Sequence, residues 1–164
     1  MKVVFDSSTL ILLAKIDILR PVAKEVKIAI PKKVRDECTM KDVFDAKVIS
    51  SLIKEGLIEV KEAGLKRAIP KLCNDFKIQP GEAEALHLAM EEGCTLAVDD
   101  GPTIKACKIL DIRFTTAIHF LFKVVEAGKM DREMAMVKLE RLSFYGRYNK
   151  RIIENALKRI EGGI

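Results

Sequence analysis

The stretch that most constrains the fold is residues 3–13, VVFDSSTLILL, near the start of the 164-residue chain. Three apolar residues lead directly into Asp6, three hydroxyl residues follow, and a second, leucine-rich run begins at Leu10. A short apolar run bounded by polar residues is typical of a strand buried on both faces, as in parallel sheets covered by helices. Serine and threonine are preferred helix N-caps, so the second run is expected to be helical. The stretch therefore predicts a strand–helix unit of an α/β protein.

Asp6 is expected at the carboxyl end of that strand, where open α/β sheets bind their ligands. It could instead do no more than cap the following helix, whose positive end favours an acidic residue. Which role applies depends on whether other carboxylates meet at the same edge of the sheet.

The rest of the chain alternates between strand-like and helix-like segments. Strands are expected at 26–30, 57–60, 96–98 and 112–114. Helices are expected at 32–38, 41–55, 65–76, 82–92, 103–110, 117–127, 131–142 and 149–160, and 16–22 is a helix or a turn. Pro31 is expected at the first position of its helix, and Pro70 is expected to kink or divide its own. The alternation predicts one domain, 1–164, with a mostly parallel sheet covered by helices on both faces.

Composition restricts the class of protein more than its activity. Hydrophobic residues make up 49% and charged residues 32%, as in soluble globular proteins, and the net charge of +5 permits a polyanionic partner without requiring one. The four cysteines have no CxxC spacing and the two histidines fit no zinc pattern, which favours free thiols in a reducing compartment. A charged residue follows the first apolar run closely, and no run of about 18 apolar residues occurs, so neither a signal peptide nor a membrane span is predicted. We expect a cytoplasmic protein.

A second pair of acids closes a second predicted strand. Asp99 and Asp100 follow the strand 96–98 in the same way that Asp6 follows the first one. If the two strands are neighbours, these carboxylates meet, and their mutual repulsion raises their pKa values unless a cation neutralises them. Oxygen-only clusters favour hard ions such as Mg²⁺ or Mn²⁺. The alternative is an ordinary Asp-Asp-Gly-Pro turn, and the residues alone leave both interpretations open.

Three glutamates are weaker candidates. Glu37 lies in the helix after Pro31, and Glu82 lies in the first turn of the helix after Pro80, where the helix dipole favours an acid. Glu84 is two residues further on and points to another side of that helix. On position alone, all three are surface residues.

The order of these residues resembles the PIN-domain ribonucleases, which include the toxins of prokaryotic toxin–antitoxin pairs. The resemblance rests on Asp6-Ser7-Ser8, on VRDE at 34–37, on GEAEALHLA at 81–89 and on VDD at 98–100. It covers residues 1–122, which leaves 123–164 as a C-terminal helical extension. It implies a PIN-like three-layer sandwich with an acidic cluster that binds one or two divalent metal ions.

The resemblance also assigns roles to individual residues. Asp6 matches the first acid of the family, Glu37 the second and Glu82 the third, and the fourth is Asp99 or Asp100. Ser8 stands where a polar residue supports the first acid, so Ser7 or Ser8 would then cap the helix in place of Asp6. The chain departs from the commonest toxin pattern by having Glu82 in place of an aspartate, for which Glu84 could substitute, and by having Gly101-Pro102 after the fourth acid. Thr115 or Thr116 is expected to line the same pocket.

The function that this resemblance implies is a Mg²⁺- or Mn²⁺-dependent endoribonuclease acting on single-stranded RNA. Such a protein could be the toxin partner of a small antitoxin, and it is expected to form a homodimer. The alternative is a catalytically silent PIN fold that binds RNA or a protein. The segment 144–151, FYGRYNKR, contains both tyrosines and three basic residues. It is expected to be a loop between packed helices, although it could also grip RNA.

Overall fold

The computed structural model of the chain describes residues 1–64 and 66–163. Within these residues, one sheet has the strand order β3-β2-β1-β4-β5. Its strands are β1 (Lys2–Phe5), β2 (Lys27–Pro31), β3 (Ile58–Lys61), β4 (Thr95–Ala97) and β5 (Phe114–Thr115). All neighbouring strands are parallel, and Val4 of β1 lies opposite Ala29 of β2 and Leu96 of β4. The sheet is thus parallel throughout, where the sequence predicted a mostly parallel one.

Ten helices accompany the sheet in the part of the chain that the structure describes. They are α1 (Ser7–Lys15), α2 (Leu19–Glu25), α3 (Lys32–Thr39), α4 (Phe44–Lys54), α5 (Ala68–Phe76), α6 (Pro80–Glu92), α7 (Gly101–Ile109), α8 (Ala117–Glu126), α9 (Arg132–Tyr145) and α10 (Lys150–Glu161). None of these described helices has the length and apolar character needed to cross a bilayer.

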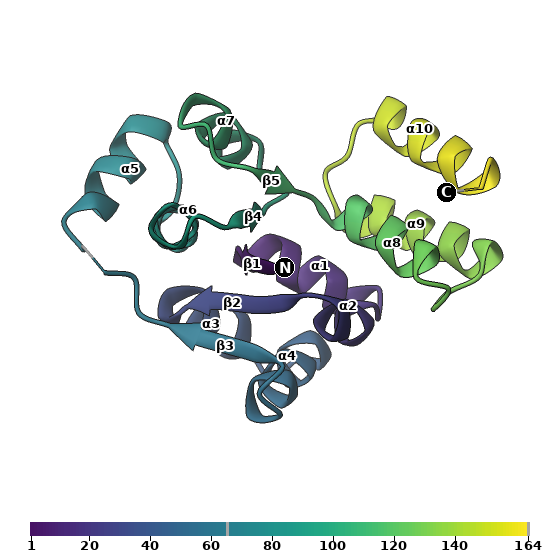
Figure 1. Ribbon diagram of the computed structural model, residues 1–164, viewed down its shortest axis with the longest axis horizontal. Helices are drawn as coiled ribbons and strands as arrows, with labels where there is room; N and C mark the ends of the chain where they lie inside the picture. The colour runs from purple at the N-terminus through teal and green to yellow at the C-terminus, as the bar shows by residue number, and fades with distance from the viewer. Residues whose placement is uncertain (65, 164) are drawn as a thin grey trace.

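The helices form layers on the two faces of the sheet. The connections from β1 to β2 and from β2 to β3 step in one direction along the sheet, whereas those to β4 and β5 step in the other. Because crossovers between parallel strands are right-handed, the two sets of helices cover opposite faces. Accordingly, α1, α3 and α4 contact one another, while α6 packs on β1, β2 and β4 with α5 and α7 beside it. The predicted three-layer α/β sandwich is confirmed, and Figure 1 shows its arrangement.

The central strand β1 is held from every side. Val3, Val4 and Phe5 are completely buried, and the Phe5 ring stacks on Phe120 of α8 with 5.1 Å between the ring centroids. Burying a side chain of this size contributes about 1.5–3 kcal/mol. Because β1 is fixed in this way, the backbone position of Asp6, the next residue, is fixed as well.

The C-terminal helices gather at one end of the molecule, where α10 lies beside α9 and the chain ends (Figure 1). Helix α9 also contacts α8 and α1, so the segment is packed against the first layer. The apolar residues of α9 are partly in the core and partly at the surface. Leu139 and Leu142 are buried in the core, whereas Met134 and Val137 are about half exposed.

The segment 16–22 contains both alternatives that were considered for it. Helix α1 ends at Lys15, and Asp17 then adopts a left-handed conformation with φ of 58° before α2 begins at Leu19. Aspartate tolerates this conformation better than most residues, because its short polar side chain can hydrogen-bond locally.

Both proline predictions were wrong in detail. Pro31 is the last residue of β2 and the N-cap of α3, one position before the helix begins. Pro70 is the third residue of α5, where its missing amide would have had no acceptor within the helix, so it neither kinks nor divides α5. The predicted helix 65–76 begins at Ala68 in the structure, and residue 65 lies outside the described residues.

Candidate acidic site

The sheet places two aspartates at the point where its strand order reverses. Chain connections run from β1 outward to β2 and β3, and then return past β1 to β4. The crevice outside the carboxyl ends of β1 and β4 is therefore the topological switch point, the usual place for a ligand in such sheets. Asp6 follows β1 directly, and its backbone amide donates to the Ala97 carbonyl of β4 at 3.1 Å. Asp99 lies two residues beyond the end of β4.

Asp6 is completely buried and caps α1. Its Oδ1 accepts a hydrogen bond from the Thr9 amide at 2.9 Å, and its Oδ2 accepts one from the Ser8 hydroxyl at 2.8 Å. The prediction that Ser7 or Ser8 takes over the capping was wrong, because the Asp6 carboxylate itself occupies the capping position. Ser8 makes instead the contact that a residue supporting Asp6 requires.

Asp99 is mostly buried beside Asp6, and Thr9 links the two. The Thr9 hydroxyl donates to Asp99 Oδ2 at 2.7 Å, while the Thr9 amide donates to Asp6. Asp99 also accepts hydrogen bonds from the Ala117 amide at 3.1 Å and from the Tyr148 hydroxyl. A single threonine at the start of α1 thus sets the relative position of the two acids.

The electrostatics of this pair favour the uptake of a positive charge. Burial raises the pKa of Asp6 to about 7, and repulsion from Asp99 adds to the increase. Burial likewise raises the pKa of Asp99, although its hydrogen bonds from Tyr148 and Thr9 oppose the change. Burial and the charge of Asp99 raise the pKa of Tyr148, so its hydroxyl remains a hydrogen-bond donor. A bound proton or metal cation would offset the repulsion between the two carboxylates and the cost of burying their charge.

Glu37 and Glu82 meet at the N-terminus of α6. The Glu82 carboxylate accepts a hydrogen bond from the Gln79 amide at 2.8 Å and forms a capping box. The Glu37 carboxylate accepts the Ser7 hydroxyl and lies directly against Gly81, where a Cβ atom would be 2.4 Å from Glu37 Oε1. Partial burial raises the pKa of Glu82, and the charges of Asp100 and Glu37 raise it further. Gly81 is therefore the residue that lets the two glutamates approach.

Asp100 caps α7 by accepting hydrogen bonds from the Thr103 amide at 3.0 Å and the Thr103 hydroxyl at 2.7 Å. It also lines a cavity of about 370 Å³ together with Asp99 and Glu82. The other residues of this cavity come from α1, from the last residue of α9 and from the two residues after it: Ser8, Ile11, Leu12, Lys15, Tyr145, Gly146 and Arg147. Both candidates for the fourth acid thus line the same cavity. The choice between Asp99 and Asp100 stays open.

The chemistry of these donors fits Mg²⁺ or Mn²⁺, because the donors are carboxylate oxygens, the ligands that hard cations prefer. Asp6, Glu37, Glu82, Asp99 and Asp100 are therefore the candidate ligands of such an ion. In the described residues, however, no three His, Cys, Asp or Glu side chains stand close enough to hold a metal ion. All five carboxylates are engaged instead in helix caps or in hydrogen bonds from hydroxyl groups. The cluster has suitable atoms at one sheet edge but not a closed coordination sphere.

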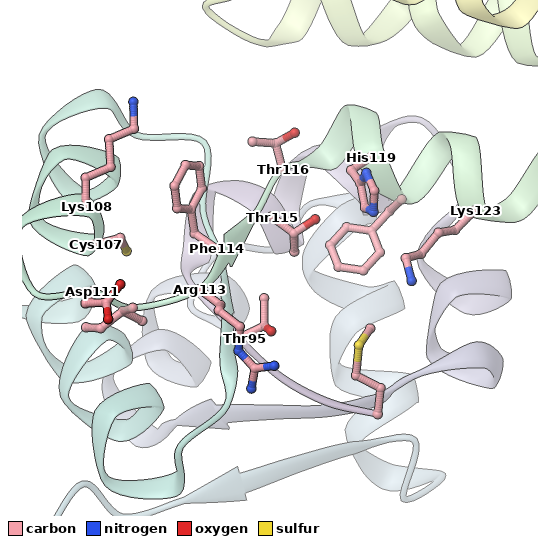
Figure 2. A pocket seen from close by; sticks show the side chains of 13 residues that line it. Thr95, Cys107, Lys108, Asp111, Arg113, Phe114, Thr115, Thr116, His119 and Lys123 are labelled. Carbon is pink, nitrogen blue, oxygen red and sulfur yellow. The ribbon is translucent and has the colours of Figure 1, made fainter. Parts of the chain in front are cut away.

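Three predicted supporting residues line other cavities. Glu84 lines a different cavity of about 670 Å³, between α5 and the start of α6, because it points about 200° around the helix from Glu82. Thr115 and Thr116 line a third cavity of about 790 Å³ along β5, which Figure 2 shows with Lys108, Arg113, His119 and Lys123 around it. Thr116 directly precedes Ala117, whose amide donates to Asp99 at 3.1 Å, so a role for either threonine at the acids stays a prediction.

Two residues of the site were missed by sequence reasoning. Thr9 was treated only as part of a hydroxyl-rich capping stretch, although its position three residues after Asp6 is a sign of amide donation to a cap. Tyr148 is 49 residues from Asp99, and no periodicity or spacing links them. The fact that both tyrosines fall in one short segment was the only available sign.

Comparison with protein-family models shows which family the chain belongs to. The family model described as DUF3368, PIN domain, matches residues 2–162. The chain belongs to the PIN-domain family. The match includes α8, α9 and α10, so these C-terminal helices are part of the family pattern.

This PIN domain has a nuclease fold, and the predicted family is confirmed. Comparison with curated proteins gave no match, and neither did comparison with solved structures.

Proposed function

We propose that this PIN domain is a metal-dependent endoribonuclease that hydrolyses single-stranded RNA. The observation that carries the proposal is the buried Asp6–Asp99 pair at the sheet's switch point, joined through Thr9 and raised in pKa. Burying two acids side by side costs stability unless a cation or a proton neutralises them, so a functional reason for the arrangement is expected. The family supports nuclease chemistry as that reason.

In this proposal, hydroxyl residues hold the two buried aspartates, and two glutamates add negative charge beside them. Thr9 and Ser8 hold the Asp6 carboxylate, and Thr9 holds Asp99, so the two acids keep their positions without the ion. Glu37 and Glu82 add negative charge at the N-terminus of α6, where the helix dipole partly compensates it. A bound Mg²⁺ or Mn²⁺ would supply a hydroxide near neutral pH and would neutralise the phosphate and the leaving oxygen. No histidine is needed as a general base.

The substrate class follows from the walls of the acidic cavity. Lys15 and Arg147 line it together with the acids, and the Lys15 ammonium lies 5.0 Å from the centroid of the Tyr145 ring. In the proposal, these two cations contact phosphates that flank the bond to be cut, which an all-acid surface would repel. A cavity of about 370 Å³ suits an extended single strand better than a duplex.

The decisive experiment compares the protein with Asp6→Asn on a fluorescent single-stranded RNA. The wild-type protein should cleave the RNA with Mn²⁺ and stop when a chelator is added, and Asp6→Asn should lose the activity while remaining folded. Undiminished cleavage by Asp6→Asn would overturn the proposal.

A second candidate is a catalytically silent PIN domain that binds RNA. It is favoured by one observation, namely that no three acidic side chains in the described residues converge closely enough for an ion. Calorimetry without heat from Mn²⁺, together with retained affinity for the same RNA, would select this function.

We further propose that the protein is a cytoplasmic toxin that binds a small antitoxin. Its four cysteines are free thiols in the described residues, as expected in a reducing compartment. Expression of the chain should arrest growth, and co-expression of a small neighbouring gene should relieve the arrest.

The exposed apolar residues Met134, Val137 and Phe144 of α9 would form the homodimer contact. Sedimentation of a Val137→Lys variant as a smaller species than the wild-type protein would support that contact.

A further inference from the structure

The link between α9 and α10 reaches the acidic site. Tyr148 lies in this link, and its hydroxyl donates to Asp99 Oδ1 although the two residues are 49 positions apart. The neighbouring residues Tyr145, Gly146 and Arg147 line the acidic cavity. The C-terminal segment therefore forms one wall of the site, which otherwise comes from the sheet edge and from α1, α6 and α7.

Gly146 shows that the position of Tyr148 is built into the backbone. A Cβ atom on Gly146 would lie 2.4 Å and 2.8 Å from two carbons of the Tyr148 ring, and 3.0 Å from the Leu142 carbonyl oxygen. A larger residue would push the ring away from Asp99, since no flexible end can yield there. Gly146 thus meets a steric requirement of the Tyr148–Asp99 contact.

Both sides of the link are anchored. On one side, α9 packs against α1 and α8, and Leu142 in its last turns is completely buried. On the other side, the Asn149 side chain accepts the Ile152 amide at 2.9 Å and starts α10. The link is therefore held at two fixed helix ends, and Tyr148 is not a side chain on a free tail.

Three groups donate hydrogen bonds to Asp99, and Tyr148 is the one that comes from the C-terminal segment. Its Oδ2 accepts the Thr9 hydroxyl, the Ala117 amide donates between the two oxygens, and Oδ1 accepts the Tyr148 hydroxyl. Such hydrogen bonds from surrounding residues fix the direction in which a carboxylate presents its remaining lone pairs. Without Tyr148, Asp99 would be held mainly through Oδ2, because Oδ1 would keep only the longer 3.3 Å contact with the Ala117 amide.

We propose that Tyr148 is a positioning residue that orients Asp99 for metal binding, and that Gly146 makes its approach possible. This inference rests on the proposed function. It makes the C-terminal helical segment part of the catalytic apparatus, since the site is complete only while α9 and α10 are docked.

The test uses the full chain and reads Mn²⁺ affinity by calorimetry alongside steady-state RNA cleavage. Tyr148→Phe keeps the ring and removes only the hydroxyl. It should weaken Mn²⁺ binding by about tenfold and lower kcat by a similar factor, with the KM for RNA unchanged. Gly146→Ala should shift both quantities in the same direction. Ser51→Ala is the matched control, because it removes a hydroxyl that donates to the Glu55 carboxylate on α4, away from the site.

Failure of this inference is distinguishable from failure of the proposed function. If Asp6→Asn abolishes Mn²⁺ binding and cleavage while Tyr148→Phe matches the wild-type protein, the nuclease function stands and the positioning role is overturned. If the wild-type protein neither binds Mn²⁺ nor cleaves RNA, both fall together. Should Gly146→Ala unfold, Tyr148→Phe alone decides, because the ring that packs in the link is retained.

Discussion

Asp6 accepts the hydrogen bonds that begin α1 while it lies completely buried next to Asp99. A neutral residue would serve the cap equally well, since asparagine is as good an N-cap as aspartate. Burial therefore makes the negative charge a cost in the metal-free protein, and under the proposed function a bound cation would compensate it.

The first prediction concerns the pH dependence of metal-free stability. Because the pKa of Asp6 is raised from 3.8 to about 7 on folding, the folded state binds more protons than the unfolded state between these values. This contribution to the free energy of unfolding is fully present below about pH 4 and is lost as the pH rises through about 7. Asp6→Asn cannot lose it, so at pH 7 the variant should be more stable by on the order of 2–4 kcal/mol.

Urea unfolding with a chelator present, at several pH values from 4 to 7.5, measures this difference. The two proteins should have similar stability near pH 4 and diverge as the pH rises. An Asp6→Asn variant that is less stable than the wild-type protein at pH 7 would show that the buried charge is compensated within the protein.

The second prediction concerns the contact between Glu37 and Gly81. Gly81→Ala should displace the Glu37 carboxylate, because the new Cβ atom would stand 2.4 Å from its Oε1. We expect about tenfold lower RNA cleavage. Stability should change by no more than about 1 kcal/mol, since alanine is favoured in a helix and the glutamate side chain can move.

Gly101→Ala is the matched control for that variant. It places the same substitution at the start of α7, where a Cβ atom would meet nothing within 4 Å. Equal activity in the two alanine variants would contradict a role for the position of Glu37.

At the residue scale, the sequence identified the acids but not the bonds that hold them. Asp6, Asp99 and Asp100 could be predicted at one sheet edge because each follows a buried apolar run. The contact of Thr9 with both acids could not, since the sequence does not reveal which strands are neighbours. Tyr148 was still further from prediction, because its contact depends on how α9 packs on α1.

Helix caps connect the residue scale to the elements. Asp6 caps α1 and Asp100 caps α7 at the acidic edge, whereas Asp131 caps α9 far along the chain by accepting the Met134 amide at 2.8 Å. The same local chemistry thus occurs inside and outside the candidate site.

The third prediction uses this repetition. Asp100→Ala and Asp131→Ala should each lower the free energy of unfolding by about 1 kcal/mol through loss of a cap. Only Asp100→Ala should also lower RNA cleavage, by about 100-fold, because it removes a carboxylate from the cavity. Thermal unfolding and cleavage assays separate the two effects. If both variants keep full activity, Asp100 is a cap alone and Asp99 remains as the fourth acid.

The elements themselves were largely predictable. The strands are short apolar runs that end at polar residues or proline, and the helices have apolar residues at helical spacing, so tertiary packing and local preference agree. The errors lie at boundaries. The helix expected at 41–55 begins at Phe44, and the helix-or-turn segment 16–22 is interrupted by Asp17 in a left-handed conformation.

For the whole molecule, binding of Mn²⁺ should increase the free energy of unfolding. The fourth prediction is that Mn²⁺ at about 100 times its Kd raises the free energy of unfolding at pH 7 by about 2.7 kcal/mol. For a chain of this size, that corresponds to about 5–10 °C in Tm. Asp6→Asn should show no such increase. An equal increase in Asp6→Asn would place the bound ion outside the acidic cluster.

The contacts that assemble the acidic cluster also determine when it can exist during synthesis. Thr9 and Asp99 are 90 positions apart, and Tyr148 is a further 49 beyond Asp99. During synthesis, Asp6 is therefore made long before its neighbour β4, and Tyr148 is added later still. A nascent or prematurely terminated product lacks one wall of the site. Under the proposed function, RNA near the translating ribosome is exposed to the complete nuclease site only after Tyr148 has been made and has docked on Asp99.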